Sequence, residues 1–90
     1  MPPAITTHPK DAKVKLGEEA KFKVKASGGT VTYQWYYRTS EDGEWKVMSG
    51  ETGTILIVVA EEENIGWQFL CRATNEEGST DSKIATLKLK

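Results

Sequence analysis

Cysteine is nearly absent from this 90-residue chain, which contains a single one, Cys71. A lone cysteine excludes an internal disulfide, so the fold must be stabilised by its apolar core. Long apolar runs are absent too, because no stretch approaches the roughly 20 residues that span a membrane. The N-terminus also lacks the basic and apolar regions of a signal peptide. We therefore expect no membrane insertion, and expect any export signal to lie outside this sequence.

The chain has no excess of charge of either sign. Twelve Lys and Arg residues against thirteen Asp and Glu residues give a formal net charge of −1. Nucleic acids and anionic membranes attract proteins that carry a strong positive field. The charge balance argues against both partners, and the length corresponds to one domain with a modest core.

Sequence motifs of catalysis and metal binding are missing as well. We find no glycine-rich phosphate loop, no nucleophile elbow and no His-Glu-x-x-His run. The one imidazole, His8, has no ligand at metal-binding spacing and is predicted to be an exposed linker residue. Residues 61–64 could help to hold calcium, but they lack the Asp-x-Asp spacing and fit a solvated turn better. The prediction is a protein that is not an enzyme and has no cofactor and no metal.

The chain does contain apolar residues that recur with a period of two. In residues 20–26 apolar side chains alternate with three lysines, which is the pattern of a half-buried strand. Related runs, several of them shorter or less regular, occur at residues 4–6, 13–16, 31–38, 45–48, 54–58, 67–74 and 83–90. Clusters of Gly, Asn, Asp, Ser and Pro separate these runs, as turns would. The pattern predicts an all-β sandwich of two antiparallel sheets with about seven or eight strands, in which residues 60–64 could form one helical turn.

Five motifs follow one another along the chain in a recognisable order. They are Gly17–Ala20, Trp35 within Tyr-Gln-Trp-Tyr, Asn64–Gly66, Cys71–Asn75 and Gly78–Ser79. Together they resemble an immunoglobulin-like domain, and most closely the tandem repeats of bacterial surface and secreted proteins. The muscle and cell-adhesion intermediate set (I-set) is the nearer eukaryotic relative. The resemblance implies a Greek-key sandwich over residues 1–90, with 1–9 as linker and first edge strand, excised from a multidomain protein.

The resemblance also implies what faces the lone cysteine. The position of the family's second-strand cysteine is occupied here by Val24, so the inter-sheet disulfide is lacking. We expect Cys71 to act as a small buried hydrophobic residue. Phe69 stands where the family usually has a tyrosine, so Asn64 and Gly66 are predicted to fix the preceding corner instead. The predicted core comprises Phe22, Val24, Trp35, Ile55, Ile57, Phe69, Cys71, Leu87 and Leu89.

Two surfaces are predicted from strand parity. A candidate partner surface of aromatic, aliphatic and arginine side chains should face outward, formed by Tyr36, Arg38, Leu70, Arg72 and Ile84. The lysines at 13, 15, 21, 23 and 25 should form a basic stripe on the sheet of the second strand, where they favour solubility. Trp45 and Trp67 either cover the open ends of the sandwich or offer a sugar a stacking face.

These observations support three hypotheses for function. The first is a non-catalytic structural or adhesion module of a bacterial cell-surface or secreted protein, which acts extracellularly as a spacer or protein-binding domain. The second is a carbohydrate-binding accessory domain of a secreted hydrolase, with Trp45, Trp67 or Tyr36 as the stacking platform. The third is an intracellular muscle-type repeat, in which a reduced cysteine is expected. The predicted partners are neighbouring domains of the same chain and a protein or glycan ligand, and we expect a monomer.

Overall fold

The computed structural model describes residues 2–90, and most of its regular structure consists of short strands. The strands are β1 (Ala4–Thr7), β2 (Ala12–Val14), β3 (Glu19–Lys23), β4 (Lys25–Ser27), β5 (Thr32–Arg38), β6 (Lys46–Val47), β7 (Ile55–Val59), β8 (Gln68–Asn75), β9 (Gly78–Asp81) and β10 (Ala85–Leu89). A 3-10 turn, η1 (Glu62–Asn64), follows β7, where the sequence allows one helical turn. The strands outnumber the prediction partly because the second predicted strand is interrupted at Val24 and so forms both β3 and β4.

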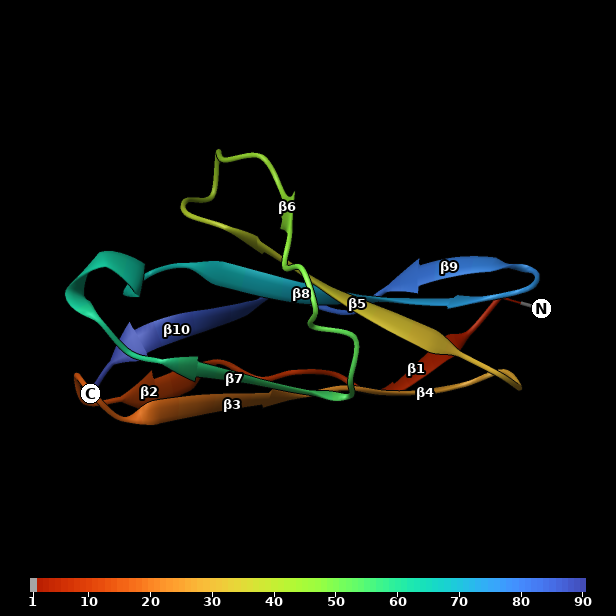
Figure 1. Cartoon of the computed structure of the whole chain (residues 1–90), viewed down its shortest axis with the longest axis horizontal. Coiled ribbons are helices and arrows are strands. Elements are labelled where there is room, and N and C mark those ends of the chain that lie inside the picture. Colours follow the sequence, from red (N-terminus) through yellow and green to blue (C-terminus); the bar gives the residue numbers. More distant parts are fainter. Residues whose placement is uncertain (1) are drawn as a thin grey trace.

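The strands form the two layers of a sandwich (Figure 1). The first layer contains β1 paired with β4 and β3 paired with β7. The second layer has the order β2-β10-β8-β5-β6, with β9 also paired to β8. The predicted sandwich is confirmed, but its sheets are not antiparallel throughout, because β2 runs parallel to β10. The chain changes layers between β1 and β2 at Pro9, which has no N–H for a strand ladder.

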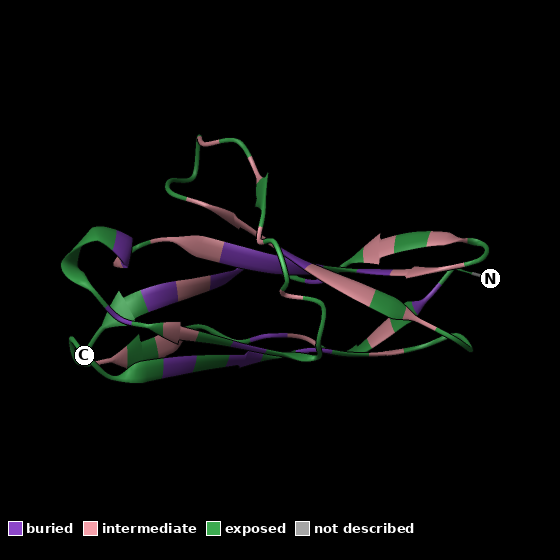
Figure 2. Ribbon diagram, in the orientation of Figure 1, coloured by how far each residue is buried: buried purple, intermediate pink, exposed green. Residues whose placement is uncertain are grey.

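The period-two pattern of residues 20–26 is confirmed in β3 and β4. Phe22 and Val24 are buried whereas Lys21 and Lys23 are exposed, and Figure 2 shows this alternation along β3. The rings of Phe22 and Phe69 lie 5.0 Å apart between their centroids, which joins the two layers through the interior. Six of the nine predicted core residues are buried: Phe22, Val24, Trp35, Phe69, Cys71 and Leu87.

Three other predicted core residues are exposed, so that part of the prediction is wrong. Ile55 and Ile57 lie on the outer face of β7, where their neighbours on β3 are lysines. The core position belongs to Leu56, which is fully buried and pairs with Phe22. Leu89 is exposed because it lies at the end of β10, beyond the covered interior.

The predicted basic stripe is divided between the two layers. Lys21 and Lys23 are on β3 of the first layer, but Lys13 is on β2, which pairs with β10 of the second layer. The three side chains still line one cleft with His8. The prediction was therefore wrong about the sheet that carries Lys13, because β2 leaves the first layer after β1.

The corner before β8 is held as the sequence predicts, by Asn64 and Gly66. The Asn64 Nδ2 group donates to the Val59 carbonyl at 2.9 Å, and its Oδ1 accepts from the Glu61 N–H at 2.8 Å. Gly66 has a φ of 92°, a left-handed conformation that favours glycine, and its N–H donates to the Leu87 carbonyl at 2.8 Å. These bonds anchor the corner although Phe69 has no hydroxyl group.

Candidate functional site

An apolar row crosses the outer face of the second layer. The strand register places Tyr36 on β5 between Val47 on β6 and Leu70 on β8. Extending the pairing of Ala85 with Phe69 by one residue sets Ile84 beside Leu70. Opposite residues on neighbouring strands lie about 5 Å apart, so this arrangement brings the four side chains into one continuous row. We call this row, together with Arg38 and Arg72, the Tyr36 face.

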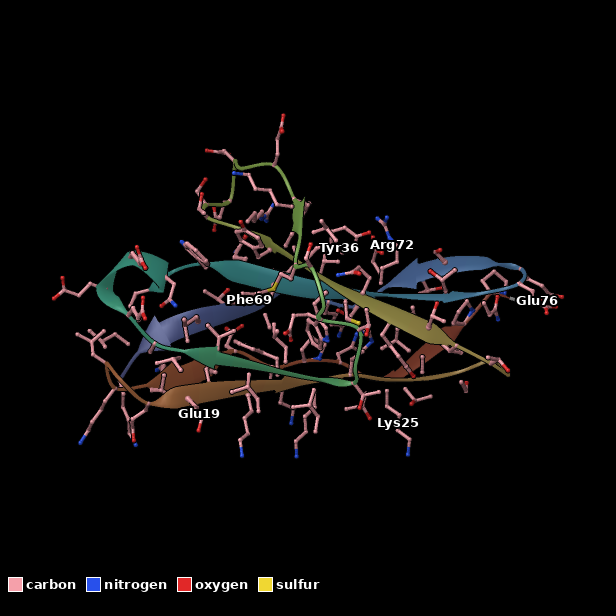
Figure 3. All side chains as sticks on the ribbon, in the orientation of Figure 1. Glu19, Lys25, Tyr36, Phe69, Arg72 and Glu76 are labelled. Carbon is pink, nitrogen blue, oxygen red and sulfur yellow. The ribbon has the colours of Figure 1, made fainter. Side chains whose placement is uncertain are left out.

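Arg72 borders the row on one side and is held in place by two contacts. Its Nε donates to the Asp81 Oδ1 at 2.8 Å, across the pairing of β8 with β9. Its guanidinium carbon lies 5.0 Å from the centroid of the Tyr36 ring. Tyr36 and Arg72 point outward from the same side of the second layer (Figure 3). The hydrogen bond to Asp81 raises the pKa of the Arg72 guanidinium, so Arg72 remains charged and oriented.

Arg38 borders the row on the other side with a matching pair of contacts. Its Nε donates to the Gln68 Oε1 at 2.6 Å, and Gln68 is its direct partner in the pairing of β5 with β8. Its guanidinium carbon lies 4.6 Å from the centroid of the Trp45 ring. Each arginine is thus ordered before any partner arrives, which lowers the entropy that binding would cost.

The structure brings all five predicted surface residues to this face, but Leu70 is less accessible than expected. Its side chain is on the outer side by strand parity, yet only 8% of the residue is exposed. Leu70 lies on the central strand β8, directly beside Tyr36 on β5. Long side chains on neighbouring strands cover a residue at such a central position. Leu70 therefore supports the face and offers little area of its own.

Trp45 and Trp67, the two candidates for sugar stacking, each have a ring face in contact with another side chain of the domain. Trp67 stacks on Tyr37 with 5.2 Å between ring centroids and an angle of 22° between planes, and it packs against the core. Trp45 is half-buried and carries the Arg38 guanidinium on its ring. The aromatic area left for a ligand is smaller than the residue types alone suggest.

Cys71 is fully buried in the same core cluster as Val24 and Trp35. Burial raises the pKa of its thiol to about 11, so the thiol is protonated and a poor nucleophile at neutral pH. Across residues 2–90 no group of three or more His, Cys, Asp and Glu side chains is arranged to hold a metal ion.

His8 is not the simple exposed linker residue that the sequence predicts. It is half-buried, and its Nδ1 accepts a hydrogen bond from the Lys83 N–H at 3.0 Å. This bond joins the crossing between β1 and β2 to the segment before β10. The sequence gives no signal for it, because the two residues are far apart along the chain.

The fold and the surface define a class of protein: an all-β sandwich domain of the immunoglobulin-like type. The model of the immunoglobulin I-set domain matches residues 3–89, and the chain belongs to this family. No helix within the described range 2–90 is long and apolar enough to cross a membrane.

Among known proteins, the chain is similar to part of Endoglucanase C of Cellulomonas fimi. The two are 37% identical over 86 residues, which is 94% of this chain and 8% of that protein. Among solved structures it is similar to the tandem Ig repeats of Dlar, with a TM-score of 0.75, 24% identity and coverage of 98% of this chain and 48% of that one. It is also similar to Sidekick-1 immunoglobulin domains 1–5, with a TM-score of 0.73, 20% identity and coverage of 99% and 20%. At these identities the two similar structures support the fold and say nothing about function.

Proposed function

We propose that this chain is a non-catalytic module of a larger bacterial secreted or cell-surface protein, in which it separates other domains and binds a protein through the Tyr36 face. The observation that carries the proposal is that face itself. Aromatic and arginine side chains are enriched at the centres of protein interfaces. Here two ordered arginines flank an aromatic and aliphatic row, with exposed Val47 and Ile84 at its two ends.

The shape of the domain supports the role of a spacer. Its principal dimensions are 40 × 23 × 20 Å, and the two ends of the chain lie at opposite ends of the long axis (Figure 1). A domain of this shape keeps its neighbours apart when joined to them at both ends. Its likeness to 8% of a much longer protein fits a module of a multidomain chain.

The binding role can be tested with the neighbouring domains of the parent protein as the probe. We expect these domains, added as separate purified proteins, to shift the amide NMR signals of Tyr36, Arg72 and Ile84. Tyr36→Ala should weaken binding by about tenfold, the effect of an interface residue worth about 1.4 kcal/mol. Lys23→Ala, on the outer side of the first layer, is the matched control and should leave binding unchanged. Shifts confined to the first layer, or no binding, would contradict the role of the Tyr36 face.

A second candidate function is a carbohydrate-binding accessory domain of a secreted hydrolase, and the likeness to part of an endoglucanase favours it. Aromatic rings bind sugars by stacking, and the Trp45 ring contacts the guanidinium of Arg38, which belongs to the Tyr36 face. On a glycan array we expect this function to give a signal that Trp45→Ala abolishes. Ile84→Ala, an exposed residue on the same layer, is the control. Absence of signal for every glycan would leave only the structural and protein-binding role.

A further inference from the structure

The strand β7 has a neighbour on one side only. It pairs with β3 along its whole length, and no segment of residues 2–90 pairs with its other edge. Figure 1 shows β3 and β7 running side by side in the lower layer. The chain between β6 and β7 crosses from one layer to the other without forming a strand that could cover this edge.

The backbone groups at this open edge belong to Ile55 and Ile57. The Val24 N–H donates to the Thr54 carbonyl at 2.8 Å, which extends the ladder between β3 and β7. Hydrogen-bonded pairs alternate along an antiparallel ladder, so even-numbered residues of 54–60 bond to β3. The N–H and C=O groups of Ile55 and Ile57 therefore point away from β3, toward the position of an additional strand.

The same residues also expose their side chains. Ile55, Ile57 and Val59 are 48%, 49% and 45% exposed. Natural proteins usually protect such an edge with lysine, proline or a bulge within the edge strand, and β7 has none of these. The Val59 carbonyl already accepts a hydrogen bond from the Asn64 side chain, which limits the open edge at that end. Ile57 lies at the centre of the open edge.

Charge is distributed unequally along this edge. Lys23 is the strand partner of Ile55 at one end, and Glu19 is the partner of Val59 at the other. The acidic residues 61–63 follow Val59 after a single alanine, Ala60. If a second β7 paired antiparallel with this edge, the acidic end of each β7 would lie beside the basic end of the other. A parallel pairing would bring like charges together.

The acidic end is already crowded with charge. A hydrogen bond with Glu63 and the repulsion of its carboxylate raise the pKa of Glu61. A nearby cation would relieve this repulsion. The edge thus favours a partner that carries lysines at the matching position.

We propose that the open edge of β7 binds a second copy of this chain, with the two β7 strands antiparallel about Ile57. The two Ile57 residues would form a hydrogen-bonded pair, and Ile55 of one copy would lie beside Val59 of the other. The result is a continuous sheet in the order β3-β7-β7-β3, with six aliphatic side chains along its centre. This proposal departs from the monomer that the sequence leads us to expect.

The association should be weak and dependent on concentration, because an edge of this length buries less than the roughly 1,200 Å² of a stable interface. We expect sedimentation velocity to show monomer at low micromolar and dimer at millimolar concentration. Ile57→Lys should weaken dimerisation by about tenfold or more, since it places two like charges at the centre. Ile84→Lys is the matched control, an equally exposed isoleucine of the second layer, and should dimerise normally.

A crosslink tests the register independently of affinity. In Ile57→Cys the two new thiols would be close enough for a disulfide, so mild oxidation at millimolar concentration should give a covalent dimer. Ile84→Cys should form no covalent dimer under the same conditions, and the buried Cys71 should not react in either variant. Circular dichroism and melting of each variant confirm that it is folded. The proposal is overturned if the native chain stays monomeric at millimolar concentration, or if Ile84→Lys and not Ile57→Lys abolishes the dimer.

Discussion

Replacing Trp35 by alanine is expected to lower the free energy of unfolding by about 3 to 5 kcal/mol. Trp35 is fully buried, and it lies opposite Cys71 in the pairing of β5 with β8. The substitution removes the largest buried side chain of the core and leaves a cavity between the layers. A small domain has about 5 to 15 kcal/mol of stability in total, so this loss is a large part of it.

The indole also holds the segment that crosses between the layers. Its Nε1 donates to the Gly53 carbonyl at 2.8 Å, and the Trp35 N–H donates to the Glu51 carbonyl at 3.1 Å. Alanine would keep the second bond and lose the first. We therefore expect the residues before β7 to loosen in the variant in addition to the loss of apolar burial.

Urea denaturation measures the effect of Trp35→Ala, and Trp45→Ala is the matched control. Trp45 is half-buried on the surface and contacts the Arg38 guanidinium, a contact worth about 0.5 to 1 kcal/mol at an exposed site. The control should therefore shift the midpoint only slightly. Equal losses in the two variants would mean that Trp35 is not the centre of the core.

The fold could be predicted where apolar and polar residues alternate clearly. In residues 20–26 the lysines leave one possible inward face, and the structure has it. The stretch from Ile55 to Val59 is aliphatic throughout, so its own sequence does not indicate which residues face inward. The pairing with β3 decides it, because Leu56 pairs with the buried Phe22. Such a register depends on a distant strand and cannot be read from a local pattern.

The candidate site could be predicted in part for the same reason. Strand parity correctly brings Tyr36 and Arg72 to one face, since both strands alternate clearly. The partner of Arg72, Asp81, was missed, although a signal for it exists. A tight turn at residues 75–78 would pair the strands on either side, and this register sets Arg72 opposite Asp81. The burial of Leu70 needed the positions of neighbouring strands.

Replacing Val24 by cysteine is expected to create a disulfide with Cys71 and to stabilise the domain. Val24 and Cys71 are both buried in one cluster with Trp35. Cys71 is on β8 of the second layer, and Val24 lies between β3 and β4 of the first layer. A bridge between them closes a loop whose entropy in the unfolded chain is worth about 4 kcal/mol. For a domain of this size, each kcal/mol raises the melting temperature by about 4 to 8 °C.

The bridge should form most readily during refolding under oxidising conditions, because burial holds the pKa of the native Cys71 thiol at about 11. Thiol titration in denaturant should then find no free thiol, and a reductant should remove the gain in melting temperature. Ala20→Cys is the matched control, a buried position on β3 about 13 Å along the chain from Val24. It should keep both thiols free. Two free thiols in folded, oxidised Val24→Cys would show that residues 24 and 71 do not face each other across the sandwich, and that burial in one cluster does not imply the family's bridge geometry.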